Sequence, residues 1–200
     1  LCRRIISVFN IMECLSDDSQ FHLNFLLSQV ITFLDTYDIP YWANGGTLLG
    51  AVRHGGIIPW DDDVDLAIPL EKKELFLEAC EKLWWYKMKL KKPSNKYYKI
   101  VHEQYNEVWV DICIIQDNGY DLRGHKNKRN IKPSWIYPLQ SIPFSTYSIK
   151  IPNKAEEYLD QIFPNWKTTV IKYNHKDKKK TKETIPLTDE LKKPMPYKWK

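Results

Sequence analysis

The sequence predicts an α+β fold in which a small central mixed sheet is flanked by helices. Three observations predict it. Segments with the 3.6-residue apolar period of a helix alternate with short apolar segments that have strand character. The strands are few, which indicates a small central sheet. The length of 200 residues fits a single domain, and a hydrophobic content of 43% supplies its core.

The first expected element is an amphipathic helix over Phe21–Tyr37. Its apolar residues recur at helical spacing along one stripe. Ser16–Ser19 offers short polar side chains that can cap its N-terminus. Pro40 prevents the helix from continuing, because the residue before a proline disfavours helical backbone.

Glycine and proline separate the later elements, and an apolar period of two residues marks the strands. Asn153 is expected to cap the last helix, with Glu156 as its capping-box partner. The expected elements are a strand at Tyr41–Ala43, a tight turn at Gly45–Gly46, a short helix over Thr47–Val52 ended by residues 54–56, a strand over Val64–Ile68 ended by Pro69, a helix over Glu71–Trp85, a hairpin of Tyr97–His102 and Glu107–Ile115 through residues 104–106, a loop over 117–134, a strand at Ile149 and Ile151, and a helix from Asn153 through Phe163.

Composition excludes several protein classes. Seven Gly exclude a collagen-like repeat, and four Cys exclude a disulfide-rich miniprotein. No apolar run approaches the roughly 18 residues of a transmembrane helix.

The cysteines form no CxxC or Cys/His cluster, so a zinc site is not expected. Free thiols fit a reducing compartment, although an even count leaves disulfides open. We see no signal peptide in Leu1–Asn10 and expect a cytoplasmic protein, or one of the Golgi lumen if an anchor lies upstream.

The positive charge gathers at the C-terminal end. Residues 171–200 hold 10 Lys and 4 acidic residues, a net charge of +6, whereas residues 1–170 have a net charge of −1. Charge runs usually solvate a segment, so we expect residues 171–200 to be a solvated, partly disordered basic tail. Contact of this tail with nucleic acid, an anionic membrane or an acidic glycan is the alternative, and no specific nucleic-acid partner is expected.

Four carboxylates lead into an apolar strand. Strand alternation places Asp61, Asp63 and Asp65 on one face, where their repulsion favours a divalent cation. Oxygen ligands point to Mg²⁺ or Mn²⁺. An EF-hand loop is excluded, because Leu66 and Lys72 stand where that loop requires Gly and Glu. The alternative is an acidic loop edge that faces water.

Another acid, Asp111, lies inside the apolar segment Val108–Ile115. A carboxylate is costly in such surroundings unless it is paired or bound to metal. We therefore expect Asp63, Asp65 and Asp111 to form a catalytic metal–carboxylate triad suited to phosphoryl transfer. The alternative for Asp111 is a buried acid bonded to the backbone or to a lysine.

A glycine-rich segment before the acids is expected to bind substrate. Gly45, Gly46 and Thr47 follow a strand and open a helix, which allows a phosphate to approach the backbone N–H groups. Arg53 could then clamp a phosphate with two hydrogen bonds, and His54 lies next to it. The alternatives are an ordinary turn, a surface arginine and a histidine that hydrogen-bonds within a loop.

The segment Tyr41–Asp65, YWANGGTLLGAVRHGGIIPWDDDVD, closely resembles the signature of the LicD family, which includes bacterial phosphocholine transferases and the animal fukutin-related proteins. Weaker similarity continues through the strand of Asp111 and through residues 136–166. The resemblance implies a nucleotidyltransferase-like fold. It also implies a LicD-like catalytic domain over residues 20–170, between an N-terminal extension of residues 1–19 and the basic tail.

The resemblance further implies a reaction and residue roles. A phospho-alcohol, such as phosphocholine or ribitol phosphate, would pass from a CDP-alcohol to a glycan hydroxyl with release of CMP. Asp63 and Asp65 match the family's metal-binding pair, and Asp61 matches the acid before it. Asp111 falls where the third carboxylate is expected, as a metal ligand or as the base for the acceptor hydroxyl. The glycines with Thr47 match the phosphate-binding turn.

The chain also departs from the family pattern. Cys113 and Ile114 stand where the family often has an aromatic–proline pair, which leaves the donor and acceptor pockets undefined. Two other functions stay open: a nucleotide-sugar glycosyltransferase, because Asp63-Val64-Asp65 fits an acid-x-acid metal motif, and a non-catalytic binding module of the same fold. The short segment before this motif disfavours the first, and the presence of all three carboxylates disfavours the second.

Overall fold

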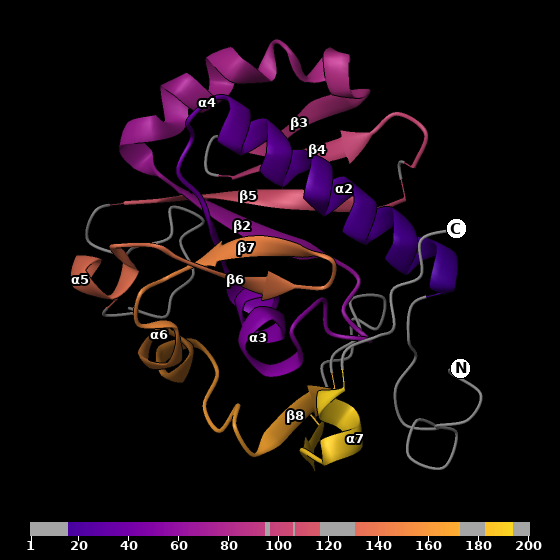
Figure 1. Cartoon of the computed structure of the whole chain (residues 1–200), viewed down its shortest axis with the longest axis vertical. Coiled ribbons are helices and arrows are strands. Elements are labelled where there is room, and N and C mark those ends of the chain that lie inside the picture. The colour runs from indigo at the N-terminus through magenta and orange to yellow at the C-terminus, as the bar shows by residue number, and fades with distance from the viewer. Residues whose placement is uncertain (1–15, 95–96, 106, 117–130, 173–182, 194–200) are drawn as a thin grey trace.

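The computed structural model describes residues 16–94, 97–105, 107–116, 131–172 and 183–193. Its centre is a five-stranded sheet with the strand order β1-β2-β5-β4-β3 (Figure 1). β2 and β5 are parallel and the other neighbours are antiparallel, so the predicted mixed α+β fold is confirmed. The strands are β1 (Trp42–Ala43), β2 (Val64–Pro69), β3 (Met88–Ser94), β4 (Tyr97–His102) and β5 (Trp109–Ile115).

Two helices come from the N-terminal part of the chain. α2 (Asp17–Thr36) lies across the sheet and packs on β4 and β5, as Figure 1 shows. It begins four residues earlier than the apolar pattern indicated, because the Ser16 hydroxyl caps it by accepting from the Ser19 N–H at 3.1 Å. α3 (Gly45–His54) begins at Gly45, so the two glycines form its first turn rather than a separate turn before it.

The helix expected over Glu71–Trp85 is wrong in its length. The chain instead forms η2 (Leu70–Lys72), α4 (Lys73–Cys80) and η3 (Leu83–Tyr86). Phe76 is buried as expected, whereas Leu75, which was placed on the same apolar face, is 38% exposed. The chain leaves the helical segment at η3 and enters β3, a strand that was not expected. The segment is therefore too short to carry a long apolar stripe.

A second antiparallel pair, β6 (Gln140–Phe144) and β7 (Tyr147–Ile151), lies between α5 (Pro133–Ile136) and α6 (Ala155–Ile162). The expected capping box at the start of α6 is wrong. The Asn153 side chain accepts from Gln140 Nε2 at 2.8 Å, and Glu156 pairs with Lys167. Residues 117–130 of the expected loop lie outside the described residues.

Folded structure continues beyond residue 170. β8 (Thr169–Lys172) pairs with β9 (Glu183–Pro186), and α7 (Asp189–Lys192) follows. Val170 and Leu191 are buried together, with Trp60 packed against them. Residues 183–193 therefore contain ordered elements, although most of their described side chains are exposed, as expected of a solvated segment; the lysine-rich residues 173–182 lie outside the described part. Within that part, no helix has both the length and the apolar character needed to cross a bilayer.

Candidate active site

Three consecutive carboxylates form a cluster directly before β2. One oxygen from each of Asp61, Asp62 and Asp63 lies within 4.8 Å of the others. Because β2 begins only at Val64, strand alternation does not apply to residues 61–63, and Asp62 joins a cluster from which alternation had left it out.

Electrostatic repulsion in this cluster acts most clearly on Asp61. Loss of water around its carboxyl raises its pKa well above the ordinary value, and the negative charges of Asp63, Asp65 and Asp62 raise the pKa further. A hydrogen bond with the Asp63 side chain acts in the same direction. The four carboxylates are thus close enough to repel one another, and a bound cation would relieve this repulsion.

The strand register brings Asp111 beside Asp65. Asp65 on β2 and Asp111 on the parallel strand β5 are direct partners, so their side chains share one face of the sheet. Asp111 is 7% exposed, and its Oδ1 lies 3.3 Å from Lys99 Nζ on β4. Asp111 was interpreted either as a residue of the metal site or as a buried acid bonded to the backbone or to a lysine. Both interpretations have a structural basis, because Asp111 neighbours the acidic cluster and also pairs with a lysine.

The glycines at the start of α3 make room for two of the carboxylates. A Cβ added at Gly45 would lie 2.8 Å from Asp65 Oδ2, and a Cβ at Gly46 would collide with Asp61 Oδ2. Gly45 also has a φ of +53°, a backbone conformation that other residues rarely adopt. Glycine is therefore required at both positions for Asp61 and Asp65 to approach the first turn of α3.

The main chain of Asp65 is held on both sides by the start of α3. Its N–H donates to the Thr47 hydroxyl oxygen at 2.7 Å, and its carbonyl accepts from the Asn44 N–H at 3.1 Å. Thr47 is 3% exposed, and its hydroxyl oxygen is used to position Asp65. The Cys113 thiol adds a contact of 3.6 Å to Asp65 Oδ1.

Asn44 and Tyr158 are site-supporting residues that sequence reasoning missed. The Tyr158 hydroxyl of α6 donates to Asn44 Oδ1 at 2.9 Å, and both residues are buried. Asn44 in turn contacts Asp65 through its backbone. Asn44 directly precedes the glycine pair, which was a usable signal, but 114 residues separate it from its partner.

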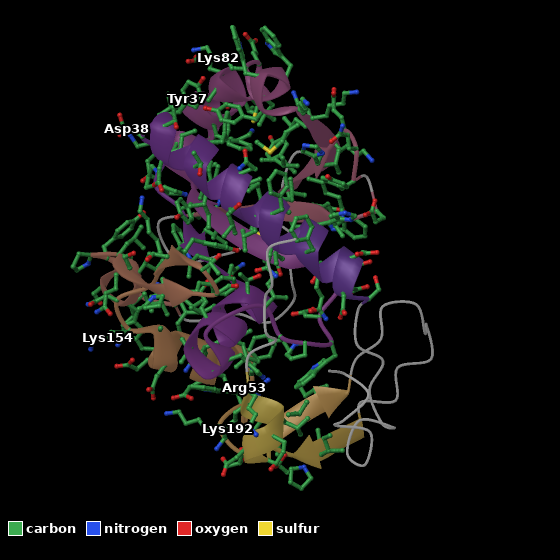
Figure 2. The ribbon with its side chains drawn as sticks, turned by 45° about the vertical axis from the view of Figure 1, so that its right-hand side comes forward. Tyr37, Asp38, Arg53, Lys82, Lys154 and Lys192 are labelled. Atoms are coloured by element: carbon green, nitrogen blue, oxygen red, sulfur yellow. The ribbon has the colours of Figure 1, made fainter. Side chains whose placement is uncertain are left out.

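Arg53 and His54 lie in the last turn of α3, roughly 12 Å along the helix axis from Gly45. Arg53 donates to the carbonyl oxygens of Trp166 and Thr169 at 3.0 and 3.3 Å, and burial lowers its pKa to about 10. Figure 2 shows Arg53 next to the C-terminal helix that carries Lys192. The structure thus engages Arg53 with the C-terminal segment and does not bring it to the acidic cluster.

His54 makes a similar contact with the C-terminal segment. Its Nε2 lies 2.9 Å from the Leu191 carbonyl oxygen, and the residue is 3% exposed. Burial lowers the pKa of His54 to about 4, and the nearby charge of Arg53 contributes to this. The imidazole is therefore neutral at pH 7 and donates through Nε2 to α7.

The lowered pKa of His54 predicts a loss of stability in acid. The folded state favours the neutral imidazole, so the contribution of His54 to the free energy of unfolding is fully present above pH 6.5. This contribution falls by about 3 kcal/mol as the pH decreases towards 4. Urea unfolding at several pH values measures the change. His54→Gln keeps an N–H donor but does not titrate, so its stability should fall less over this interval; an identical fall would contradict the prediction.

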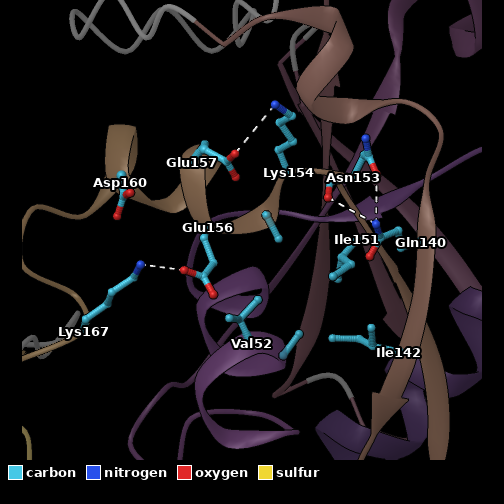
Figure 3. Close-up of a pocket in the computed structure, with 12 residues that line it drawn as sticks. Val52, Gln140, Ile142, Ile151, Asn153, Lys154, Glu156, Glu157, Asp160 and Lys167 are labelled. Atoms are coloured by element: carbon cyan, nitrogen blue, oxygen red, sulfur yellow. Dashed lines mark hydrogen bonds and ion pairs between the residues drawn. The ribbon is translucent and has the colours of Figure 1, made fainter.

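A cavity of about 670 Å³ lies between α3, α6 and the β6–β7 hairpin, and none of the carboxylates of residues 61–65 lines it (Figure 3). Its apolar lining includes Val52 and Ile142. Glu156 pairs with Lys167 at 2.5 Å, and Lys154 lies 3.8 Å from Glu157. Because glutamates neutralise both lining lysines, the cavity is a poor match for the phosphates of a nucleotide.

The acid-bearing strand and the glycine start of α3 lie within the part of the chain that matches a known family. The family model described as "LicD/FKTN/FKRP, nucleotidyltransferase domain" matches residues 38–154. The chain belongs to the LicD family. The match includes the glycine pair, the acids of residues 61–65 and Asp111, and it ends just before α6.

Several curated proteins are similar to this chain. Mouse "Ribitol 5-phosphate transferase FKRP" is 28% identical over 156 residues, which cover 67% of this chain and 29% of that protein. "Lipopolysaccharide cholinephosphotransferase LicD" of Haemophilus influenzae is 31% identical over 85 residues, 42% of this chain and 26% of that protein. An uncharacterized protein of Rickettsia typhi is 29% identical over 196 residues, 90% of this chain and 60% of that protein.

This member of the LicD family spans less than a third of the length of FKRP. Among solved structures, a lincosamide antibiotic adenylyltransferase is similar with a TM-score of 0.46 and 16% identity, covering 76% of this chain and 88% of that one.

Proposed function

We propose that this LicD-family chain transfers a phospho-alcohol, such as phosphocholine or ribitol phosphate, from a CDP-alcohol to a glycan hydroxyl and releases CMP. The observation that carries the proposal is the placement of Asp65 beside Asp111, next to the carboxylate cluster of residues 61–63. The printed names of FKRP and LicD, which describe ribitol 5-phosphate and choline phosphate transfer, support the class of transferred group.

The acidic residues fit Mg²⁺ or Mn²⁺. The donor set consists of carboxylate oxygens, which these hard cations prefer. Burial, and then the negative charges of Asp63, Asp65 and Asp62, raise the pKa of Asp61, and a bound cation would offset both effects. The predicted ligands Asp63, Asp65 and Asp111 would hold the ion, with Asp61 beside them. The carboxylate oxygens found within 4.8 Å of one another among the described residues are those of Asp61, Asp62 and Asp63, so Asp65 and Asp111 would complete the site from the adjoining strands. When bound, such an ion supplies a Lewis acid for the donor phosphate and lowers the pKa of an attacking hydroxyl.

The chain's own residues would orient the reactants. The N-terminal turn of α3 offers backbone N–H groups and the positive end of the helix dipole, which suit a phosphate. Asn44 and Thr47 fix the main chain of Asp65, so its carboxylate is held for binding. Asp111, whose Oδ1 pairs with Lys99 Nζ, would act as a ligand of the ion or as the base that accepts the proton of the acceptor hydroxyl.

CMP release from CDP-choline, CDP-ribitol, CDP-glycerol and CDP-ethanolamine tests the proposal. Slow hydrolysis by water can report the donor without the glycan acceptor. We expect one donor to release CMP with Mg²⁺ or Mn²⁺, and we expect excess chelator to stop the release. Release that survives the chelator would contradict the metal-dependent mechanism.

The same assay distinguishes the other functions. Hydrolysis of a UDP-sugar in place of every CDP-alcohol would favour a glycosyltransferase. Absence of turnover together with absence of metal-dependent binding of any CDP-alcohol would favour a non-catalytic module.

A further inference from the structure

A lysine is built into the acidic site. Lys99 on β4 is the register partner of Asp111 on β5, and Asp111 is the register partner of Asp65 on β2. Register partners on adjacent strands present their side chains on the same face of a sheet. Three neighbouring strands therefore carry a row of two carboxylates followed by one ammonium group.

Two contacts hold the Lys99 side chain in this row. Its Nζ lies 3.3 Å from Asp111 Oδ1 and 3.9 Å from the centre of the Trp109 ring. The side chain is only 24% exposed, whereas lysine side chains usually extend their ammonium groups into water. An ion pair combined with a cation–π contact makes Lys99 a positioned charge at the end of the acidic row.

The next residue in the row provides a comparison. Lys91 on β3 is the register partner of Lys99 on its other side, but its side chain is exposed. No ion pair of Lys91 with a carboxylate is found among the described residues. Lys91 therefore has the same charge one strand further from Asp111, which makes it a matched control.

We propose that Lys99 takes the place of one of two divalent cations, so that the acidic site binds a single metal ion. This inference rests on the proposed metal-dependent function. Two-metal sites hold ions about 3.5–4 Å apart, with carboxylates shared between them. Lys99 already contacts Oδ1 of Asp111 at one end of the row. Its compact ammonium supplies positive charge there and repels a second cation.

Counting bound Mn²⁺ tests this directly. Electron paramagnetic resonance of free Mn²⁺, titrated with the purified chain without nucleotide, gives the number of ions bound per chain. We expect one ion for the unaltered protein, for Lys99→Arg and for Lys91→Met. We expect two ions for Lys99→Met, because Asp111 then no longer pairs with the Lys99 ammonium group and can bind a second metal ion. Circular dichroism checks that each variant is folded, and Lys99→Gln serves if Lys99→Met is not.

Each outcome decides between the possibilities. Two ions in the unaltered protein would overturn the inference without reference to any variant. A single ion in folded Lys99→Met or Lys99→Gln, bound as in the unaltered protein, would overturn it as well and leave Lys99 a structural role. No bound Mn²⁺ in any protein would instead overturn the metal-dependent function on which the inference rests.

Discussion

Asp65→Asn should lower CMP release by roughly 10³-fold, equivalent to about 4 kcal/mol of transition-state stabilisation. The substitution keeps the shape of the side chain and removes the charge that would bind the metal. The fold should persist, because Thr47 and Asn44 hold the main chain of Asp65 rather than its carboxylate. Initial rates of CMP release at saturating donor and Mn²⁺ measure the effect.

Asp38→Asn is the matched control for this substitution. Asp38 is exposed and has a φ of +51°, which asparagine also tolerates, and it lies just after α2, outside the acidic cluster. Its rate should equal that of the unaltered protein. Retention of more than about a tenth of the activity by Asp65→Asn would remove Asp65 from the metal site.

Gly45→Ala should nearly abolish stabilisation of the protein by Mn²⁺ and lower the free energy of unfolding by about 1–2 kcal/mol. The stability loss arises from the φ of +53°, and the metal defect arises because the new Cβ displaces Asp65 Oδ2 from its position 2.8 Å away. The carboxylate is the mobile end of a side chain and can move aside, so crowding damages the site more than the fold. Thermal unfolding with and without Mn²⁺ measures both effects.

Two other glycines separate these causes. Gly55 has a φ of +67° with open space around a Cβ, so Gly55→Ala should reduce stability and leave the Mn²⁺ response intact. Gly46 lacks the positive φ but abuts Asp61 Oδ2, so Gly46→Ala should reduce the Mn²⁺ response with a smaller loss of stability. An unchanged Mn²⁺ response in Gly45→Ala would show that the glycine pair does not serve the acidic site.

Secondary structure was predictable where an apolar period runs clearly along an element. The helix α2 and the strand β2 follow their apolar periods. β3 was missed because it is an edge strand rich in lysine, although Met88 and Leu90 alternate with exposed lysines. Such edges are typically charged, which obscures the strand pattern.

Asp61, Asp63, Asp65 and Asp111 of the candidate site could be proposed from the sequence, because they lie close together along the chain or in a strongly apolar strand. The surrounding contacts were less accessible. Thr47 was expected to bind substrate, and the structure uses its hydroxyl oxygen to position Asp65. Arg53 and His54 carry hydrogen bonds to residues more than 100 positions away. Asp62 joins the cluster only because β2 begins after it.

The family resemblance, the run of carboxylates and the main apolar elements can be found in the sequence, because they depend on residues close together along the chain. The contacts of Lys99 with Asp111, of Tyr158 with Asn44 and of α7 with His54 are visible only in the folded structure. These pairs arise from strand register and helix packing between distant segments. Local spacing carries no record of such partners, so charge and hydrogen bonding at the site depend on the assembled fold.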